Sequence, residues 1–332
     1  MKAEQGPSQE LPARFVHEQW PYRPRFKRVN GWRMHYIDEG TGDPVVLLHG
    51  NPAWGFLYRA FVEPLVAAGR RVIVPDMVGF GLSEKPVREQ AHTLDGHIAN
   101  LTGLLRQLDV QNATMVCHDW GGPTGLGFAL SNRERVRALV IMSTWAWPLP
   151  PAEFHTRIFP WRMMHAPLVG PYLLGRHNAL AGRGMYLSVV DRKKFRNTAQ
   201  SVYESVLPDP GSRLLTWTWP RWIPLDHTAR AMQRFEWLER ELKNRTSRRC
   251  WSGAGKTRSS TTKPSRRDSR SSCLTPKAPS WSPAGIFCRR IPGPRSRRRS
   301  TAFSIGSMGN SDEWDRNCPK RRPRREKTGA GA

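Results

Sequence analysis

Apolar and polar positions change their spacing repeatedly along the first half of the chain. Two short alternating runs, 26–29 and 34–38, flank Asn30-Gly31, a dipeptide typical of a two-residue hairpin turn. The more continuous apolar run 45–48 is typical of a strand buried on both faces, and helical spacing follows at 56–68. The pattern therefore predicts a β-hairpin, then a buried strand and a helix.

The alternation of strand and helix continues to residue 142. Strands are expected at 71–75, 114–118 and 136–142, and helices at 92–108 and 123–130. Strands that alternate with helices usually pair in parallel. We therefore expect an α/β fold with a mostly parallel sheet and helices on both faces.

The regular alternation of strand and helix does not continue between residues 145 and 225. This region is rich in aromatic residues and proline, with helical spacing only at 154–164 and 195–206. We interpret it as a helical cap inserted above the carboxyl ends of the strands, where such sheets bind ligands. The expected organisation is a core at 1–147, a cap at 148–227, a helix returning to the core at 228–243 and a separate segment at 244–332.

Composition also changes near residue 245. Residues 246–332 hold 22 Lys and Arg against 5 Asp and Glu, a net charge of +17 out of +26 for the whole chain. A segment with high net charge and few apolar residues is expected to be disordered. Residues 1–15 do not resemble a secretory signal, so none is expected. No apolar run reaches membrane-spanning length, and only one cysteine precedes residue 245. A cytoplasmic protein without a membrane partner is expected.

The most informative stretch is 113–122, Ala-Thr-Met-Val-Cys-His-Asp-Trp-Gly-Gly. It predicts a strand, a tight turn with Asp119 at its apex and a helix start. A strained turn needs small flanking residues, which Gly121 and Gly122 supply. A carboxylate at such an apex is suited to attack an alkyl carbon and form an ester. The alternative is that Asp119 only caps the following helix.

Three motifs stand out: His49-Gly50-Asn51-Pro52, Asp76 with the Gly-rich segment 79–86, and His118-Asp119-Trp120-Gly121-Gly122. Together they resemble the haloalkane dehalogenase family of α/β-hydrolases. The resemblance covers about residues 15–243. It implies that Asp119 displaces halide from a small halogenated alkane and that water hydrolyses the resulting alkyl ester. Related epoxide hydrolases share the Asp-Trp elbow but usually have an aromatic residue in place of Asn51 and use two cap tyrosines, so that activity is the alternative.

The resemblance also implies roles for individual residues. The side chains of Asn51 and Trp120 would donate hydrogen bonds to the departing halide, and their backbone N–H groups would form the oxyanion hole. Simpler structural roles are a turn cap for Asn51 and cover of the sheet end for Trp120. No cofactor and no metal are expected. An apolar substrate pocket is expected from Trp145, Trp147, Phe154, Phe159 and Trp161.

No histidine of this chain is expected to act as the catalytic base. His118 neighbours Asp119, but adjacent strand side chains point to opposite faces, so a core or supporting position is expected. His92 and His97 are expected on a surface helix. The cap histidines have no metal-ligand spacing; they are His155, His165 and His177.

The acid and the base that the family supplies from later strands are both missing in this reading frame. Regrouping the codons of 249–257 one base upstream permits Leu-Leu-Val-Trp-Gly and, three residues on, Asp. The same shift over 285–290 permits Gly-His-Phe-Leu-Gln-Glu. We infer a frameshift near 244–247, which would remove the last strands, leave an unpaired sheet edge and impair the hydrolytic step.

The rival interpretation gives the basic segment a function of its own. Runs such as Arg297-Arg298-Arg299 and Lys320-Arg321-Arg322 can neutralise phosphates. The chain would then be a catalytically inactive hydrolase-like protein with a polyanion-binding segment. On the frameshift interpretation, nucleic acid binds only non-specifically.

Overall fold

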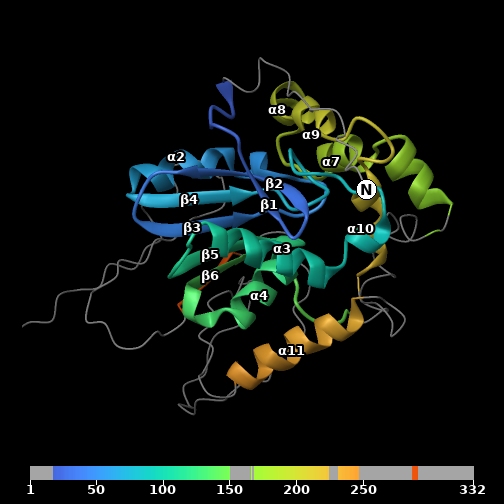
Figure 1. Ribbon diagram of the computed structural model, residues 1–332. Coiled ribbons are helices and arrows are strands. Elements are labelled where there is room, and N and C mark those ends of the chain that lie inside the picture. The colour runs from blue at the N-terminus through green and yellow to red at the C-terminus, as the bar shows by residue number, and fades with distance from the viewer. Residues whose placement is uncertain (1–17, 150–165, 167, 224–230, 247–285, 291–332) are drawn as a thin grey trace, which may run out of the picture. The chain divides into compact units, whose positions relative to one another are not determined.

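A sheet with helices on both faces forms the centre of the protein. The computed structural model describes residues 18–149, 166, 168–223, 231–246 and 286–290, all within one compact unit. Within these ranges the sheet has seven strands in the order β1-β2-β4-β3-β5-β6-β7 (Figure 1). Strands β4, β3, β5 and β6 are parallel, whereas β1, β2 and β7 run antiparallel to their neighbours. The predicted α/β fold is confirmed.

The hairpin begins the sheet at the place that Asn30-Gly31 predicts. β1 (Arg25–Val29) and β2 (Trp32–Glu39) are joined by these two residues, which have φ of 49° and 89°. Positive φ at both positions is the geometry of a type I′ turn, which matches the strand twist. The remaining strands are β3 (Asp43–Leu48), β4 (Arg70–Pro75), β5 (Ala113–His118), β6 (Val136–Met142) and β7 (Ile286–Arg290).

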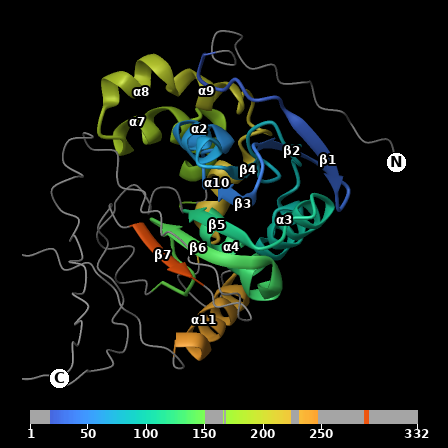
Figure 2. The same ribbon diagram turned by 90° about the vertical axis from the view of Figure 1, so that its left-hand side faces the viewer.

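Alternating strand side chains divide the core between two helix layers. On one face Leu47 belongs to a buried cluster with Val62 of α2 (Arg59–Ala67). On the other face Leu48 packs with residues of α3 (Leu94–Gln107) and α4 (Gly121–Ser131). The two layers lie on opposite sides of the sheet in both views (Figures 1 and 2). Short 3-10 turns precede α2, α3 and β6; they are η1 (Gly55–Tyr58), η2 (Glu89–Ala91) and η3 (Arg133–Arg135).

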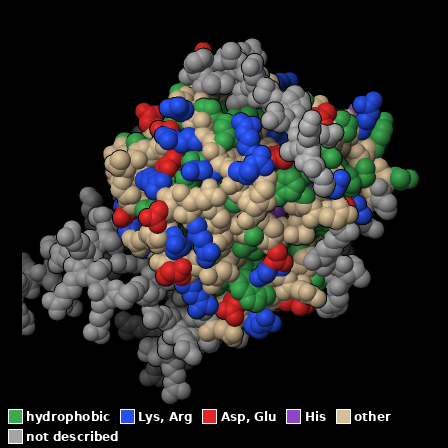
Figure 3. Space-filling view, in the orientation of Figure 1, with side chains coloured by type: hydrophobic (Ala, Val, Ile, Leu, Met, Phe, Trp, Pro, Cys, Tyr) green, Lys and Arg blue, Asp and Glu red, His purple; other side chains and the backbone are tan. Residues whose placement is uncertain are grey.

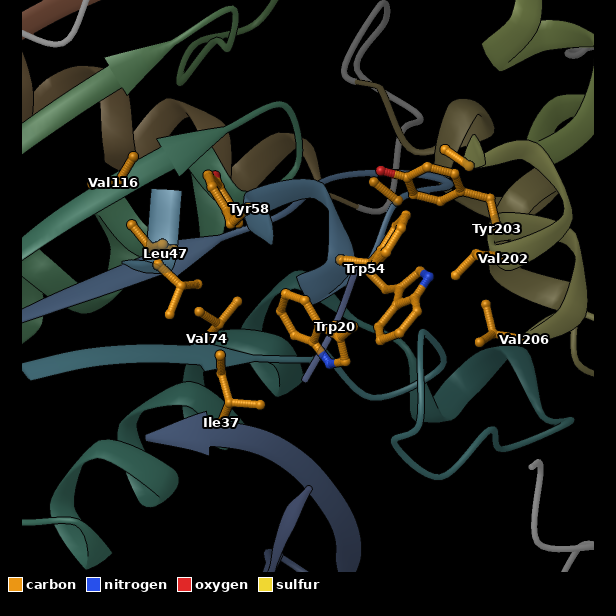
Figure 4. Close-up of a cluster of buried hydrophobic side chains, with 14 of the residues drawn as sticks. Trp20, Ile37, Leu47, Trp54, Tyr58, Val74, Val116, Val202, Tyr203 and Val206 are labelled. Carbon is orange, nitrogen blue, oxygen red and sulfur yellow. The ribbon is translucent and has the colours of Figure 1, made fainter. Parts of the chain in front are cut away.

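The cap is a set of short helical segments that pack onto the core. Val202 and Tyr203 belong to the same buried cluster as Trp20 and Trp54, and Figure 4 shows the two tryptophans between these cap residues and the sheet. The expected helical region 195–206 is present, whereas 154–164 lies outside the described residues. The described segments are η4 (Pro171–Arg176), η5 (Leu180–Gly184), α7 (Met185–Ser188), α8 (Arg192–Thr198), α9 (Gln200–Ser205) and α10 (Leu214–Arg221).

The chain returns from the cap through α11 (Met232–Thr246), close to the helix expected at 228–243. Phe235 and Leu238 of α11 are fully buried in a cluster with residues of α4. The expected boundaries of the cap stay predictions, because 150–165 and 224–230 lie outside the described residues. No helix in the described part of the chain is long and apolar enough to cross a membrane.

Strand β7 corrects the expectation of an unpaired sheet edge at β6. It pairs antiparallel with β6, with Ile286 opposite Met142. Its sequence begins with Ile and Phe, residue types that favour strands. This local preference is concealed by the basic composition of the surrounding segment. Apart from β7 and the end of α11, the region 244–332 lies outside the described residues, so its expected disorder stays a prediction.

Asp76, which is fully buried directly after β4, joins three parts of the core. One carboxylate oxygen accepts a hydrogen bond from the Gly55 N–H at 2.7 Å. The other accepts from the Leu82 N–H at 2.8 Å and lies 2.8 Å from the Nδ1 atom of His35. Burial by itself would raise the pKa of Asp76, but the histidine ring and the backbone donors together hold it below its ordinary value. The ionised carboxylate therefore fixes the loops on either side of the site.

Asp76→Asn is expected to lower the free energy of unfolding by about 3–5 kcal/mol at neutral pH, because the amide nitrogen cannot accept the donors that face it. Since the folded state lowers the pKa of Asp76, the difference should be complete at neutral pH and shrink as the pH falls through that pKa. Denaturant titrations at several pH values measure it. Glu134→Gln, at a 70 % exposed side chain, is the control and should cost less than about 1 kcal/mol; equal losses would contradict the assignment.

Candidate active site

The turn between β5 and α4 places Asp119 at its apex. Asp119 has a φ of 50°, in the left-handed region that side chains other than glycine rarely adopt. The chain passes so close to β3 that a Cβ atom on Gly121 would overlap the Leu48 carbonyl oxygen. A Cβ atom on Gly122 would overlap the Thr144 hydroxyl. Both glycines are therefore required by close packing around the turn.

Thr144, just after β6, holds the turn from the neighbouring strand. Its hydroxyl donates to the backbone oxygen of Asp119 at 2.5 Å, and the same oxygen accepts from the Gly122 N–H at 2.9 Å. The strained turn is thus stabilised by side-chain and backbone donors together. No sequence motif marks Thr144, because its role depends on a contact between segments 25 residues apart.

The Asp119 carboxylate faces backbone donors from two loops. The Asn51 N–H donates to Oδ1 at 2.7 Å, and the backbone N–H of Trp120 also helps to stabilise the charge. Burial nevertheless dominates and raises the pKa of Asp119 above its ordinary value. Gly50 lies so close that a Cβ atom there would overlap the carboxylate. The geometry thus brings together Asp119, Asn51 and Trp120, three residues singled out from the sequence.

The side chains of Asn51 and Trp120 both meet the cap. The Asn51 amide nitrogen donates weakly, at 3.3 Å, to the backbone oxygen of Thr216 in α10, and its Oδ1 atom is buried without a partner in the described structure. The Trp120 ring is 3 % exposed. Its ring centroid lies 4.7 Å from that of Trp219 and 5.1 Å from that of Trp145. An aromatic enclosure therefore covers the turn.

Two indole N–H groups in this enclosure, those of Trp145 and Trp219, are buried and find no hydrogen-bond partner among the described residues. Such donors give an otherwise apolar site some capacity to bind an anion or a polar atom. Trp219 was not predicted, because tryptophans are frequent throughout the cap sequence. Trp147 packs against the same cluster. The other expected pocket residues, Phe154, Phe159 and Trp161, lie outside the described residues.

Comparison with known proteins identifies the family. Residues 43–163 match the family of the α/β hydrolase fold. The haloalkane dehalogenase of Mycobacterium marinum is 32% identical over 212 residues, which cover 62% of this chain and 67% of that protein. The chain belongs to the haloalkane dehalogenase-type α/β hydrolases. The expected family is confirmed.

Some relatives of this α/β hydrolase are named as decarboxylases rather than as dehalogenases. The cis-3-alkyl-4-alkyloxetan-2-one decarboxylase of Shewanella oneidensis is 37% identical over 209 residues, 62% of this chain and 64% of that protein. Among solved structures, the haloalkane dehalogenase DatA from Agrobacterium tumefaciens C58 matches with a TM-score of 0.59 and 25% identity, over 67% of this chain and 74% of that one. The chain thus spans about two thirds of the length of these curated relatives.

Two histidines of this α/β hydrolase lie near the Asp119 carboxylate. The Nε2 atom of His49 accepts the Met77 N–H at 3.0 Å, so its Nδ1 carries the proton and donates to the Gly50 oxygen at 3.0 Å. Both nitrogens are therefore occupied. His118 is partly buried, its Nδ1 has no partner in the described structure, and burial lowers its pKa. Among the described residues, neither histidine has a hydrogen bond to a carboxylate that could orient it as a base.

His92 and His97 correct the expectation of a surface helix. Both are buried, with exposures of 0% and 2%, and their rings stack 6.0 Å apart. The edge of His97 also packs 4.8 Å from the Trp219 ring, and burial lowers its pKa well below the ordinary value. The helix pattern was correct, but the cap helix α10 covers the face that would otherwise meet water. No cluster of three or more potential metal ligands occurs in the described part of the chain.

Asp119→Asn in this hydrolase is expected to raise the free energy of unfolding at neutral pH. The folded state raises the pKa of Asp119, so the unfolded wild type loses its proton first as the pH rises. The difference in unfolding free energy between the variant and the wild type should therefore grow as the pH rises from the unfolded to the folded pKa of Asp119. It should level off above the folded pKa. Denaturant titrations from acidic to neutral pH measure it.

Asp109→Asn is a matched control, because Asp109 also has a left-handed φ, 45°, but its side chain is exposed. Asparagine tolerates this conformation at both positions. The control should change stability by less than about 0.5 kcal/mol at neutral pH. A destabilised Asp119→Asn protein would show that the buried charge does not oppose folding.

Proposed function

We propose that Asp119 attacks the halogen-bearing carbon of a small haloalkane and forms an alkyl ester with release of halide. The observation that carries this proposal is the hydrogen bond from the Asn51 N–H to Oδ1 of a carboxylate at a left-handed turn apex. One oxygen is held by the backbone, and the other is the nucleophile. The pKa raised by burial supports the role, because a poorly solvated carboxylate is a stronger nucleophile.

The departing halide is held by the side-chain donors of Asn51 and Trp120. The Asn51 amide has two N–H groups, of which the contact with the Thr216 oxygen uses one. The aromatic rings of Trp145 and Trp219 exclude water, which strengthens hydrogen bonds to a small anion. Binding of halide thus favours the charge distribution of the transition state rather than that of the neutral substrate.

The hydrolytic step is incomplete in this chain. The backbone N–H groups of Asn51 and Trp120 already face the carboxylate and would stabilise an oxyanion when water attacks the ester. The base and its orienting acid are missing from this reading frame, and the hydrogen bonds of His49 occupy both of its nitrogens. We attribute the loss to a frameshift near 244–247. The expected outcome is a single turnover that stops at the alkyl ester.

Decarboxylation of a cis-3-alkyl-4-alkyloxetan-2-one is a second candidate, favoured by the 37% identity to the Shewanella oneidensis protein. Release of carbon dioxide without halide chemistry would select it. Epoxide hydrolysis is less well supported, because Asn51 stands where epoxide hydrolases usually have an aromatic residue. Of the cap tyrosines that such an enzyme would need, Tyr172 is 60% exposed and Tyr203 packs against the Phe56 ring.

Halide release tests the first step. With excess 1-bromoalkane, the 332-residue protein should release about one equivalent of bromide per folded molecule and then stop. Asp119→Asn should release none above the uncatalysed background, whereas His118→Gln should keep the single equivalent. The rate should fall as the pH drops through the raised pKa of Asp119, because the protonated acid is not a nucleophile. Equal release by wild type and Asp119→Asn would contradict the proposal.

Restoring the reading frame tests the second step. The corrected chain should turn over continuously, since a positioned general base typically contributes about 10²–10⁴-fold in rate. Asp119→Asn in the corrected chain should abolish turnover. A corrected chain that also stops after one equivalent would show that the frame is not the cause.

A further inference from the structure

The outer end of the cap combines charge and exposed apolar side chains. Residues 185–196, called the cap tip below, include α7 and α8 and lie on the side of the molecule opposite α11 in both views (Figures 1 and 2). The segment carries four cations and one acid, Asp191, a net charge of +3. All four cationic side chains are exposed: Arg192, Lys193, Lys194 and Arg196.

Some cations of the described surface are paired with carboxylates, whereas those of the cap tip are not. At several places on the face drawn in Figure 3, Lys and Arg side chains lie beside Asp and Glu. One described ion pair joins Arg70 and Asp43. No cation of the cap tip forms an ion pair with a described carboxylate. Asp191 instead accepts the backbone N–H of Lys194 at the start of α8, 2.9 Å away. Arg192 and Arg196 lie over the Tyr186 ring, 6.0 and 4.6 Å from its centroid, which leaves their charge unneutralised.

Two aliphatic side chains project among these charges. Leu187 is 55% exposed and Val190 is fully exposed, and neither belongs to a buried cluster. Their neighbours Met185, Tyr186 and Val189 pack against the core, which anchors the cap tip to the protein. Exposed apolar side chains surrounded by basic ones are typical of segments that lie in a membrane interface.

We propose that the cap tip docks the protein onto an anionic lipid bilayer. Leu187 and Val190 enter the boundary between headgroups and acyl chains, and the four cations contact lipid phosphates. A net charge of +3 near an anionic surface corresponds to on the order of 100-fold stronger binding than to neutral lipid. A polyanion such as nucleic acid would neutralise the cations but would leave both aliphatic side chains in water. Such docking requires no membrane-spanning helix.

The docking surface belongs to the same cap that covers Asp119. Apolar alkyl compounds partition into lipid, so a docked enzyme would draw its substrate from the bilayer rather than from dilute solution. This consequence for substrate supply rests on the proposed function. The docking itself depends only on the surface of the cap tip, and its test requires no chemistry at Asp119.

Amide hydrogen exchange of the full chain, followed by mass spectrometry, tests the proposal. The probes are vesicles of phosphatidylcholine with phosphatidylglycerol, vesicles of phosphatidylcholine alone, and a DNA duplex. A readout resolved along the sequence is needed, because the 22 Lys and Arg of 246–332 also attract anionic surfaces. The anionic vesicles should slow exchange across 185–196 by roughly tenfold or more, and the neutral vesicles should have little effect.

Two independent variants separate the apolar and the charged contributions. Leu187→Asp with Val190→Asp, and Lys193→Glu with Lys194→Glu, should each abolish protection of the cap tip by anionic vesicles. The exposure of all four side chains leaves the fold intact, which circular dichroism checks. Leu168→Asp is the matched control: Leu168 is 85% exposed on the same cap, but residues 166–175 contain no Lys or Arg. The control should keep full protection.

Three results would overturn the proposal. One is protection confined to 246–332, which would assign vesicle binding to that segment alone. Another is equal protection of the cap tip by the DNA duplex, with no effect of Leu187→Asp and Val190→Asp. The third is loss of protection in Leu168→Asp equal to that in the cap-tip variants.

Discussion

The site depends on one backbone constraint, the left-handed conformation of Asp119 between β5 and α4. This turn points the Asp119 carboxylate at the Asn51 N–H, 2.7 Å away. The chain then enters α4 at Gly121. A residue in this conformation typically costs on the order of 1–3 kcal/mol and persists only when its surroundings require it. Here the close approach of β3 and the hydrogen bond from Thr144 hold the residue in this conformation. Fold and site chemistry are therefore joined at a single residue.

Asp76 and the partly buried Asp119 show how the same fold shifts two carboxyl pKa values in opposite directions. Asp76 faces the His35 ring and two backbone N–H groups, and its pKa is lowered, so it is a stable anchor for the surrounding loops. Asp119 has backbone donors but no paired cation, and burial raises its pKa. Environments that move two carboxyl pKa values apart commonly separate a structural role from a reactive one. The rings of Trp145 and Trp219 pack against Trp120, the residue next to Asp119.

Features with local causes were predictable from the sequence. Asn30-Gly31 specifies its hairpin through backbone conformation alone, and the glycine pair after Trp120 marks a tight turn before any contact is known. Features that need tertiary contacts were not predictable. His97 lies on the helix that its periodicity indicated, but only the packing of α10 shows that it is buried.

Two other features of the structure were not predicted from the sequence, each for a specific physical reason. Thr144 acts through a contact with a different strand, so no motif reveals it. Strand β7 has only five residues and lies within a long basic segment. Its strand-forming residues therefore do not stand out in the average composition of that segment. The family motifs, in contrast, were recognisable because the chemistry restricts residue type at adjacent positions.

The lifetime of the alkyl ester tests the central claim most directly. After reaction with a bromoalkane and removal of the excess, intact mass and peptide mapping would follow the alkyl group on Asp119 over time. Because no described group is positioned to activate water, the account predicts an adduct that persists unchanged for many times the period of its formation. An adduct that decays to alcohol as quickly as it forms would contradict the account and show that another residue of this chain supplies the base.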